Sequence, residues 1–344
     1  MLTEATANPM KLRPENFEPP YPAFTCALFE LKPNVTLGQI AVQYPDNGSG
    51  SSGGALREAI EATLTGDAAP WRNEWCSHVD PQGYRNDICV AYWHHQDDFR
   101  QWRARQDVGL WAAETHDIGL WIEVLTCPIP TMETSYSNEH PDWGLASRCP
   151  VRLDPDHGYF GSMRDRIPKA EDNGLPGELR ELPATDLEQG TIGHRVTVSL
   201  PDNVCFIRTV QGWQDCDTEQ QADFLENMMP VYRTGVEYLR ENPRDTNCVS
   251  ARLVEMDNDG TQVQTQTLAW FLGLEDLERW AHEHPTHHAI LDGMSSFAER
   301  YNLQIQIVLG HEVFVVPAGY SHIEYSNCHP HTGFLRFLRA EPLA

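Results

Sequence analysis

The chain repeats parts of its own sequence in the same order, and this repetition constrains the fold more than any other feature. The segment 136–144, YSNEHPDWG, recurs at 325–333 as YSNCHPHTG. At the same offset of 189 residues, the segment 120–125 aligns with 309–314. An ordered series of matches indicates a duplicated structural unit rather than chance similarity.

A further pair of matching segments predicts the local structure of each copy. Segments 91–102 and 269–280, offset by 178 residues, each resemble an aromatic-rich strand followed by the acidic start of a helix. In the first copy Phe99 and Trp102 are three positions apart, and the second copy keeps this spacing, which places both bulky residues on one helix face.

Each copy is also expected to begin with a strand and a helix. These are 35–44 and 55–64 in the first copy, separated by a glycine-serine loop at 47–54, and 203–210 and 219–241 in the second. The resulting order is β-α-β-α-β, with room for a hairpin before the second helix. It predicts split β-α-β units of ferredoxin-like type.

We therefore predict an α+β fold in which two duplicated ferredoxin-like units pack together or close into a barrel-like core flanked by helices. The first unit is expected over residues 17–150 and the second over residues 201–340. Residues 151–200 form a connector rich in Asp, Pro and Gly that contains the motif Arg164-Asp165-Arg166. A connector of this length with such a specific centre is often functional.

Composition disfavours several classes of function. The 344 residues, 40% of them hydrophobic, can bury a core without disulfides. The formal net charge of −25 disfavours nucleic acids and anionic membranes as partners. The nine cysteines occur singly, without a C-x-x-C pair, which argues against a disulfide framework and a structural zinc site. Because we find neither a leader-like N-terminus nor an apolar stretch of about 18 residues, we expect a soluble cytoplasmic protein.

The duplication separates residues that serve the fold from residues that serve chemistry, because the former should occur in both copies. His329 has a counterpart in His140, so we interpret it as a turn histidine satisfied by the backbone. His311 has no counterpart, since Ile122 occupies the matching position. A lone histidine in an apolar strand is usually a core residue, but the missing counterpart and the adjacent Glu312 favour a functional role.

A histidine-rich segment at 282–288, HEHPTHH, also lacks a counterpart in the first copy. Four histidines in seven residues could bind zinc, but Pro285 interrupts the helix and no H-E-x-x-H spacing occurs. Binding a haem iron requires only one histidine from this segment, which is a simpler requirement than a zinc site. The alternative is that the segment is a solvent-exposed loop with no function. The chain has no C-x-x-C-H motif, so any haem is held without covalent bonds. It also has no G-x-S-x-G elbow, and the glycine-rich loop lacks the lysine of a phosphate-binding loop.

Several of these segments together resemble the haem-containing aldoxime dehydratases, and the similarity extends over most of the chain from about residue 17. The segments that carry it are HPTH at 284–287, LGHEV at 309–313, EYSNCHPHTG at 324–333, GSMRDR at 161–166 and CFIRT at 205–209. The resemblance implies a dimeric α+β barrel-like fold, akin to chlorite dismutase and dye-decolourising peroxidase. It therefore also implies a homodimer that binds haem b.

The resemblance further implies the residues of the haem site. His287 becomes the proximal iron ligand, with the neighbouring His288 as the reserve candidate. His311 becomes the distal catalyst. A distal arginine falls in the Arg164-Asp165-Arg166 run, where we favour Arg166 over Arg164.

A distal hydroxyl residue is also implied, and it falls on Thr209. The family has serine at this position, so Thr209 is a departure: its added methyl group is expected to narrow the pocket or change substrate preference.

The activity implied is the dehydration of an aldoxime to a nitrile. The substrate nitrogen would bind ferrous haem iron, and His311 would act as acid and then base, roles that suit an imidazole near neutral pH. Three alternatives stay open at this point. They are a haem peroxidase or chlorite-dismutase-like enzyme, a non-catalytic haem sensor or carrier, and a haem-free binding protein.

Overall fold

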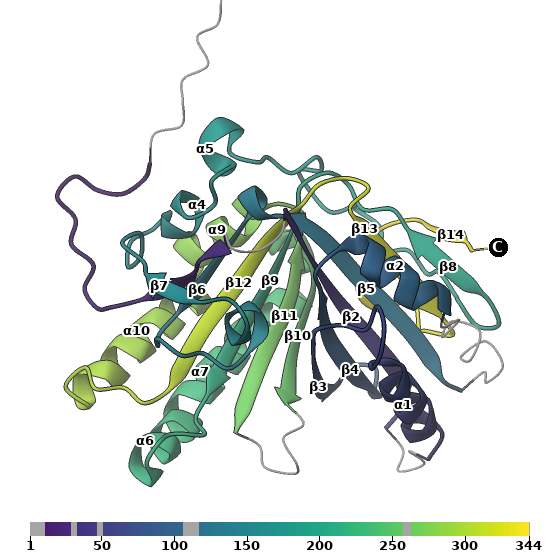
Figure 1. Ribbon diagram of the computed structural model, residues 1–344, viewed down its shortest axis with the longest axis horizontal. Helices are drawn as coiled ribbons and strands as arrows, with labels where there is room; N and C mark the ends of the chain where they lie inside the picture. Colours follow the sequence, from purple (N-terminus) through teal and green to yellow (C-terminus); the bar gives the residue numbers. More distant parts are fainter. Residues whose placement is uncertain (1–10, 29–32, 47–50, 106–116, 257–262, 344) are drawn as a thin grey trace, which may run out of the picture.

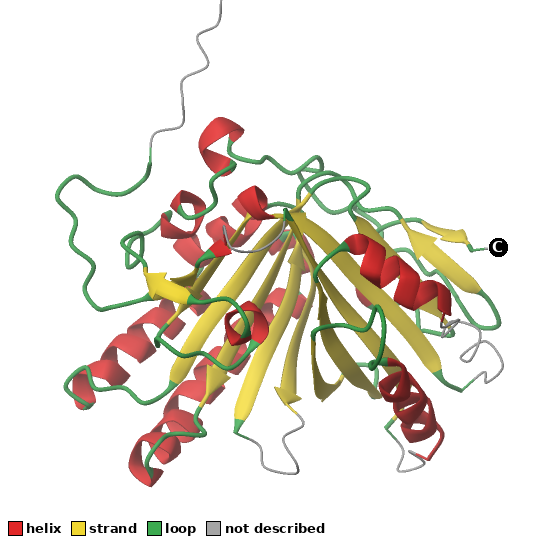
Figure 2. Ribbon diagram, viewed as in Figure 1, coloured by secondary structure: helices red, strands yellow, loops and turns green. Residues whose placement is uncertain are grey.

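A single large antiparallel sheet organises the molecule. The computed structural model describes residues 11–28, 33–46, 51–105, 117–256 and 263–343. Within these residues 14 strands form one sheet, and helices flank it on its outer sides (Figures 1 and 2). The predicted α+β class is confirmed. Among the described helices, none combines the length and the apolar character that crossing a membrane requires.

The first half of the sheet has the strand order β5-β2-β4-β3. The predicted strand 35–44 is confirmed as β2, but the first helix starts earlier than predicted, so residues 51–54 are helical rather than loop. Gly53 lets the helix approach the sheet, since a Cβ atom there would lie 2.4 Å from the Tyr44 ring. The elements of this half are β2 (Asn34–Pro45), α1 (Ser51–Thr63), β3 (Arg72–Val79), β4 (Tyr84–Trp93), α2 (Gln96–Arg105) and β5 (Gly119–Pro128).

The second half has the equivalent strand order, β12-β9-β11-β10. The helix predicted at 219–241 is instead two α-helices joined by a π-helical turn. Pro230, in the first turn of the second helix, has no N–H to donate, so the hydrogen-bond pattern shifts upstream of it. The elements are β9 (Val204–Gly212), α6 (Thr218–Asp223), the π turn η4 (Phe224–Met228), α7 (Met229–Glu241), α8 (Pro243–Thr246), β10 (Cys248–Met256), β11 (Gln264–Phe271), α9 (Leu274–Glu283), α10 (Pro285–Arg300) and β12 (Val308–Val316).

The two halves are joined by direct pairing and by an exchange of strands. At the centre β3 pairs with β10, through Cys76 with Met256 and Ser77 with Glu255. The strand that follows β5 along the chain, β6 (Met132–Tyr136), pairs with β12 of the other half. Reciprocally, β13 (Ser321–Ser326) follows β12 but pairs with β5. Each half therefore completes the edge of the other.

Residues 151–200, predicted as a connector, contribute strands to both edges of the sheet. One strand pairs with β1, and the other pairs with β13 and β14. The remaining elements are β1 (Phe24–Cys26), η2 (Ile129–Thr131), η3 (Gly144–Ser147), β7 (Val151–Leu153), α4 (Ser162–Asp165), α5 (Ala170–Asn173), β8 (Arg195–Val198), η5 (Gly333–Arg336) and β14 (Ala340–Pro342).

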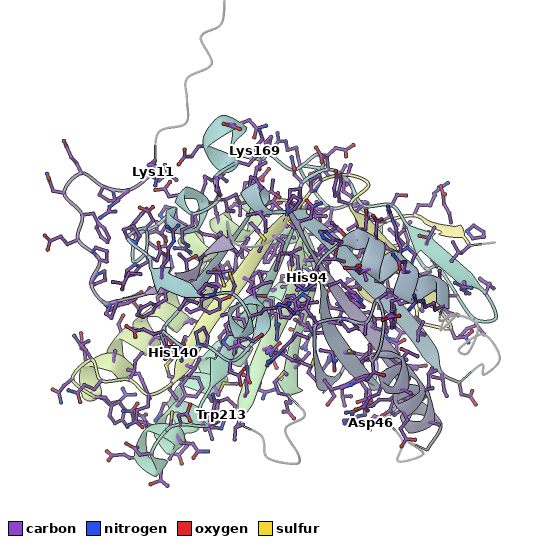
Figure 3. The ribbon with its side chains drawn as sticks, in the orientation of Figure 1. Lys11, Asp46, His94, His140, Lys169 and Trp213 are labelled. Carbon is purple, nitrogen blue, oxygen red and sulfur yellow. The ribbon has the colours of Figure 1, made fainter. Side chains whose placement is uncertain are left out.

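Buried apolar side chains form an interior between the two halves and separate layers under the helices. Figure 3 draws the described side chains on the ribbon. The interior also contains charge. The fully buried Arg208 donates to the Tyr92 hydroxyl at 2.5 Å and pairs with Glu74, and Tyr92 in turn donates to Glu312 at 2.5 Å. Burial raises the pKa of Glu312, against the smaller lowering effect of Arg208. Glu123, which aligns with Glu312 in the sequence repeat, pairs with Arg252.

We expect Arg208→Met to lower the free energy of unfolding by about 3–5 kcal/mol, because the substitution removes a fully buried cation from Glu312 and leaves Glu74 with Arg72 alone. Arg300→Met is the matched control: it breaks the half-exposed pair with Asp223 and should cost at most about 1 kcal/mol. Urea unfolding of both variants measures the difference. Equal losses would show that the interior pair does not hold the halves together.

Candidate functional site

A row of polar side chains crosses the outer face of the second half. Cross-strand pairing places Thr209 of β9 opposite both His311 of β12 and Thr267 of β11. Because side chains alternate along a strand and the neighbours Arg208 and Glu312 face the interior, His311 and Thr209 face outward. The His311 side chain is 28% exposed. The fold thus brings together two of the residues that the sequence predicted for one site.

The first half lacks this row. The register of β2 with β5 and β4 places Ile40 opposite Ile122 and Cys89, in the same arrangement. All three are fully buried in the apolar layer beneath α1 and α2. The polar row is therefore not a requirement of the shared fold.

His311 is held by residues from two other parts of the chain. Its Nε2 lies 2.8 Å from Oε1 of Glu133 on β6 and 3.2 Å from Nη2 of Arg166, which follows α4. Arg166 also donates to Glu133 at 2.7 Å. Nδ1 of His311 has no hydrogen-bond partner within the described residues. One ring nitrogen is thus anchored and the other can exchange a proton.

The two candidate arginines have different surroundings. Arg166 lies beside His311, whereas Arg164 pairs with Glu278 and donates to the carbonyl of Gly174. The geometry therefore places Arg166, and not Arg164, next to the predicted distal histidine.

The cluster is electrostatically matched. Burial alone would raise the pKa of Glu133, but Arg166 and His311 outweigh it and lower that pKa. Burial would likewise lower the pKa of Arg166, and Glu133 reverses the shift. A carboxylate and a guanidinium therefore flank the imidazole in their charged forms.

Glu133 was missed in the sequence analysis. Its partner His311 is 178 residues away, and only the pairing of β6 with β12 brings them together. A signal was present: at the offset of 189 residues Glu133 aligns with His322, so the two copies differ here.

The histidine-rich segment forms the start of α10. His284 caps this helix, because its Nδ1 accepts from the backbone N–H of Thr286, and Pro285 occupies the first turn. Trp280 Nε1 donates to the Thr286 hydroxyl at 3.2 Å. Part of the motif therefore builds the helix N-terminus and positions the histidine that follows.

His287 and His288 differ in environment. Nδ1 of His287 is buried and has no hydrogen-bond partner among the described residues. Burial lowers the pKa of His287 to about 4, and the nearby carbonyl of Ala281 offsets only part of this effect. His288 is exposed, and its Nε2 lies 2.6 Å from the carbonyl oxygen of His282. His287 is therefore a neutral imidazole with a ring nitrogen that makes no hydrogen bond, and a metal ligand must be neutral and available in this way.

Helix α10 leaves part of its apolar surface exposed, because Leu291 is open while Ile290 and Met294 are only partly buried. His287, Ile290, Leu291 and Met294 recur at the spacing of one helix face, yet Phe297 is the helix's one buried residue. Leu291 is 43% exposed. The helix packs mainly against α7, η4 and α9 on the outer side of the second half (Figure 1).

Comparison with known proteins identifies the family. The sequence profile of haem-containing dehydratases matches residues 38–334. The chain belongs to this family. It is 32% identical to phenylacetaldoxime dehydratase of Bacillus sp. (strain OxB-1), over 97% of each chain. It is 30% identical to aliphatic aldoxime dehydratase of Rhodococcus globerulus, over 94% of this chain and 92% of the relative.

A solved structure agrees with this assignment. A crystal structure of an aldoxime dehydratase in complex with butyraldoxime superposes with a TM-score of 0.85 and 27% identity, over 95% of this chain and 92% of that one. The predictions of a haem-iron cofactor and of a lyase are confirmed by the family. The haem-containing dehydratase fold is thus established for this chain.

The residues present fit a haem. A haem needs one neutral axial imidazole and apolar surroundings for its ring. His287 offers a buried nitrogen without a partner, and the uncovered apolar face of α10 adjoins it. On the sheet, the partly exposed Ile207 and Leu309 flank the polar row.

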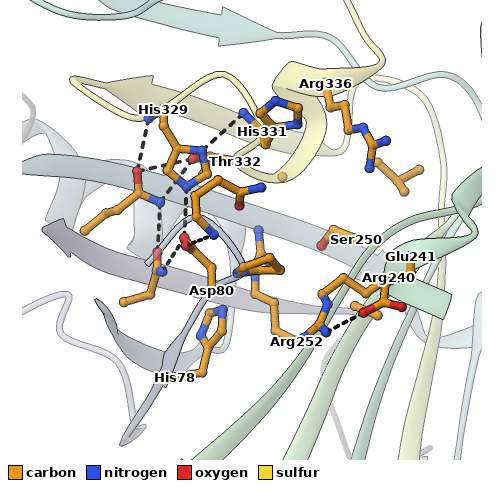
Figure 4. A pocket seen from close by; sticks show the side chains of 17 residues that line it. His78, Asp80, Arg240, Glu241, Ser250, Arg252, His329, His331, Thr332 and Arg336 are labelled. Atoms are coloured by element: carbon orange, nitrogen blue, oxygen red, sulfur yellow. Dashed lines mark hydrogen bonds and ion pairs between the residues drawn. The ribbon is translucent and has the colours of Figure 1, made fainter. Parts of the chain in front are cut away.

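A separate cavity of about 250 Å³ is lined by His329 but by neither His287 nor His311 (Figure 4). His329 was predicted to be satisfied by the backbone. Its Nδ1 does accept from the N–H of His331, but its Nε2 pairs with Asp80 at 2.9 Å. No group of three potential metal ligands occurs in the described parts of the chain, so this cavity does not compete as a metal centre.

We expect His287→Ala to purify without haem, because it removes the neutral imidazole that fits the iron. The loss of haem affinity should exceed the roughly 10–100-fold that removing an outer partner of a metal site costs. The Soret absorbance per protein measures it, and His288→Ala is the matched control, which should retain haem. The opposite pattern would transfer the ligand role to His288.

Proposed function

We propose that the chain dehydrates aldoximes to nitriles with a haem b whose iron is ferrous in the active form. The observation that carries this proposal is the cluster of His311, Glu133 and Arg166 beside Thr209, on the half of the sheet where the other copy has only apolar side chains. The names of the relatives, phenylacetaldoxime dehydratase and aliphatic aldoxime dehydratase, supply the substrate class.

His287 would hold the haem through its iron, and the apolar side chains of α10 would supply apolar surroundings for the haem ring. When bound, an iron with one protein ligand supplies an open coordination position for the aldoxime nitrogen. The chain's own residues then manage the protons and the orientation of the N–OH group.

His311 would act as general acid and then as general base. The reaction R–CH=N–OH → R–C≡N + H₂O breaks the N–O and C–H bonds. Hydroxide leaves poorly, so a proton from His311 to the leaving oxygen makes water the leaving group. The neutral imidazole can then accept the carbon-bound proton, which restores the starting state.

Glu133 and Arg166 would position this histidine. Both lie beside Nε2. Because the proton is exchanged at Nδ1, Nε2 keeps its own proton in both forms of the ring and donates it to Glu133. Arg166 in turn holds Glu133 through its own hydrogen bond to that carboxylate. Each protonation state of His311 therefore has a partner, and the ring keeps one orientation through the cycle.

We further infer that the two halves are duplicated ferredoxin-like units, with residues 151–200 as the segment between them. The support is that β5-β2-β4-β3 and β12-β9-β11-β10 have the same order and similar helix placement. The homodimer stays a prediction, which sedimentation would test, and so does the cytoplasmic location.

The first test is to reduce the purified protein anaerobically, add an alkyl or aryl aldoxime and measure nitrile. Nitrile formation by the ferrous protein supports the proposal. A Soret band without nitrile would move the assignment to a peroxidase or a haem sensor.

His311→Ala should keep haem and substrate binding but lower kcat by about 100-fold or more. Near-normal turnover of this variant would overturn the proposed acid–base role of His311.

The two arginines give a second test with a built-in control. Arg166→Gln removes a contact to His311 and should lower kcat by about 10-fold or more with haem content unchanged. Arg164→Gln removes a contact with Glu278 on α9 and should leave kcat within about 2-fold, with only the small loss of stability that breaking a part-exposed ion pair costs. If only Arg164→Gln impaired turnover, the distal arginine would be Arg164.

A further inference from the structure

A chain of hydroxyl groups connects Thr209 to helix α7. Tyr232 of α7 lies with its phenolic oxygen 2.5 Å from Oγ1 of Thr209 and 2.7 Å from Oγ1 of Thr267. Gln211 also donates to Oγ1 of Thr209, at 3.1 Å. The carbonyl oxygen of the Gln211 amide accepts from the Thr265 hydroxyl at 3.2 Å, which agrees with this orientation of the amide.

The direction of each proton follows from counting donors and acceptors. Each hydroxyl has one proton to donate and two lone pairs that accept. Thr267 is 4% exposed, and its side chain has Tyr232 as its one hydrogen-bond partner within the described residues, so its proton goes to Tyr232. Tyr232 must then send its own proton to Thr209.

Thr209 is thereby forced to act as a donor. It accepts from both Gln211 and Tyr232, which uses its two lone pairs, and its own proton is left to point away from this network. The Thr209 proton is therefore available on the side of the polar row, which also contains His311.

We propose that Tyr232 and Thr267 are positioning residues that fix Thr209 as a hydrogen-bond donor to the leaving oxygen of the substrate. This rests on the proposed function. Donation to that oxygen stabilises the charge that develops as the N–O bond breaks, whereas an accepting hydroxyl would oppose it.

The other copy of the fold argues against a purely structural role. There the positions of Thr209 and Thr267 are held by Ile40 and Cys89, which are fully buried. The fold therefore tolerates an apolar pair at these places, and the hydroxyl chain is confined to the half that contains His311.

The test compares Tyr232→Phe with Tyr301→Phe, a phenol on the opposite end of α10 from His287. Tyr232→Phe should lower kcat about 10-fold, the effect of one lost hydrogen bond, with KM and Soret absorbance nearly unchanged. Tyr301→Phe should have no such effect. In a Thr209→Val background, Tyr232→Phe should lower kcat by less than about 2-fold further, because both changes remove the same hydrogen bond between Tyr232 and Thr209.

A spectroscopic readout does not depend on turnover. A hydrogen-bond donor lowers the stretching frequency of carbon monoxide bound to ferrous haem, so Tyr232→Phe and Thr209→Val should both raise it. Thr267→Val keeps the Tyr232 phenol but removes the donor that fixes its direction. The hydrogen bond between Tyr232 and Thr209 can then run either way, so the carbon monoxide band should split or broaden. This variant also keeps the test available if Tyr232→Phe does not fold.

The outcomes separate the two proposals. Unchanged kcat and an unchanged carbon monoxide band in Tyr232→Phe, with Thr209→Val impaired, would overturn the hydroxyl chain alone. Additive losses in the double variant would do the same. Normal turnover in Thr209→Val would remove Thr209 from the mechanism and the hydroxyl chain with it, while absence of nitrile from the unmodified protein would overturn the proposed function itself.

Discussion

The pairing of Arg208 with Glu312 through the Tyr92 hydroxyl fixes the register on which the candidate site depends. These two charged residues are direct cross-strand neighbours on β9 and β12 and face the interior. A slip of β12 by one residue would move Glu312 to the outer face and His311 to the interior, while Arg208 and Thr209 of β9 stayed in place. The buried contact therefore determines that Thr209 and His311 stand side by side outside.

The two halves share one strand order but differ in what they contribute. In the first half the outer row is apolar and fully buried beneath its helices, which is the solution that favours stability. In the second half the same row is polar and partly exposed, and α10 keeps an uncovered apolar face. Sites of function commonly give up local stability in this way. The haem of this family would restore part of the buried apolar contact.

Sequence reasoning reached the features that depend on local pattern and repetition. The duplication located the main strands and helices, and the contrast between His311 and Ile122 singled out one residue of the polar row. It could not reach contacts that depend on strand partners, because alternation specifies which face a side chain takes but not which strand lies beside it. Glu133 and Tyr232 were missed for this reason: each meets the row only through tertiary packing.

The exchange of strands explains why the site cannot be divided among the predicted segments. Glu133 lies on β6, which follows the first half along the chain but pairs with β12 of the second. Arg166 comes from the segment 151–200, and His311 and Thr209 from the second half. All three regions thus meet at one imidazole, and the second half alone would present His311 without the carboxylate and the guanidinium that hold it. The two halves supply frameworks of equivalent strand order, and the exchanged strand joins residues of both at the candidate site.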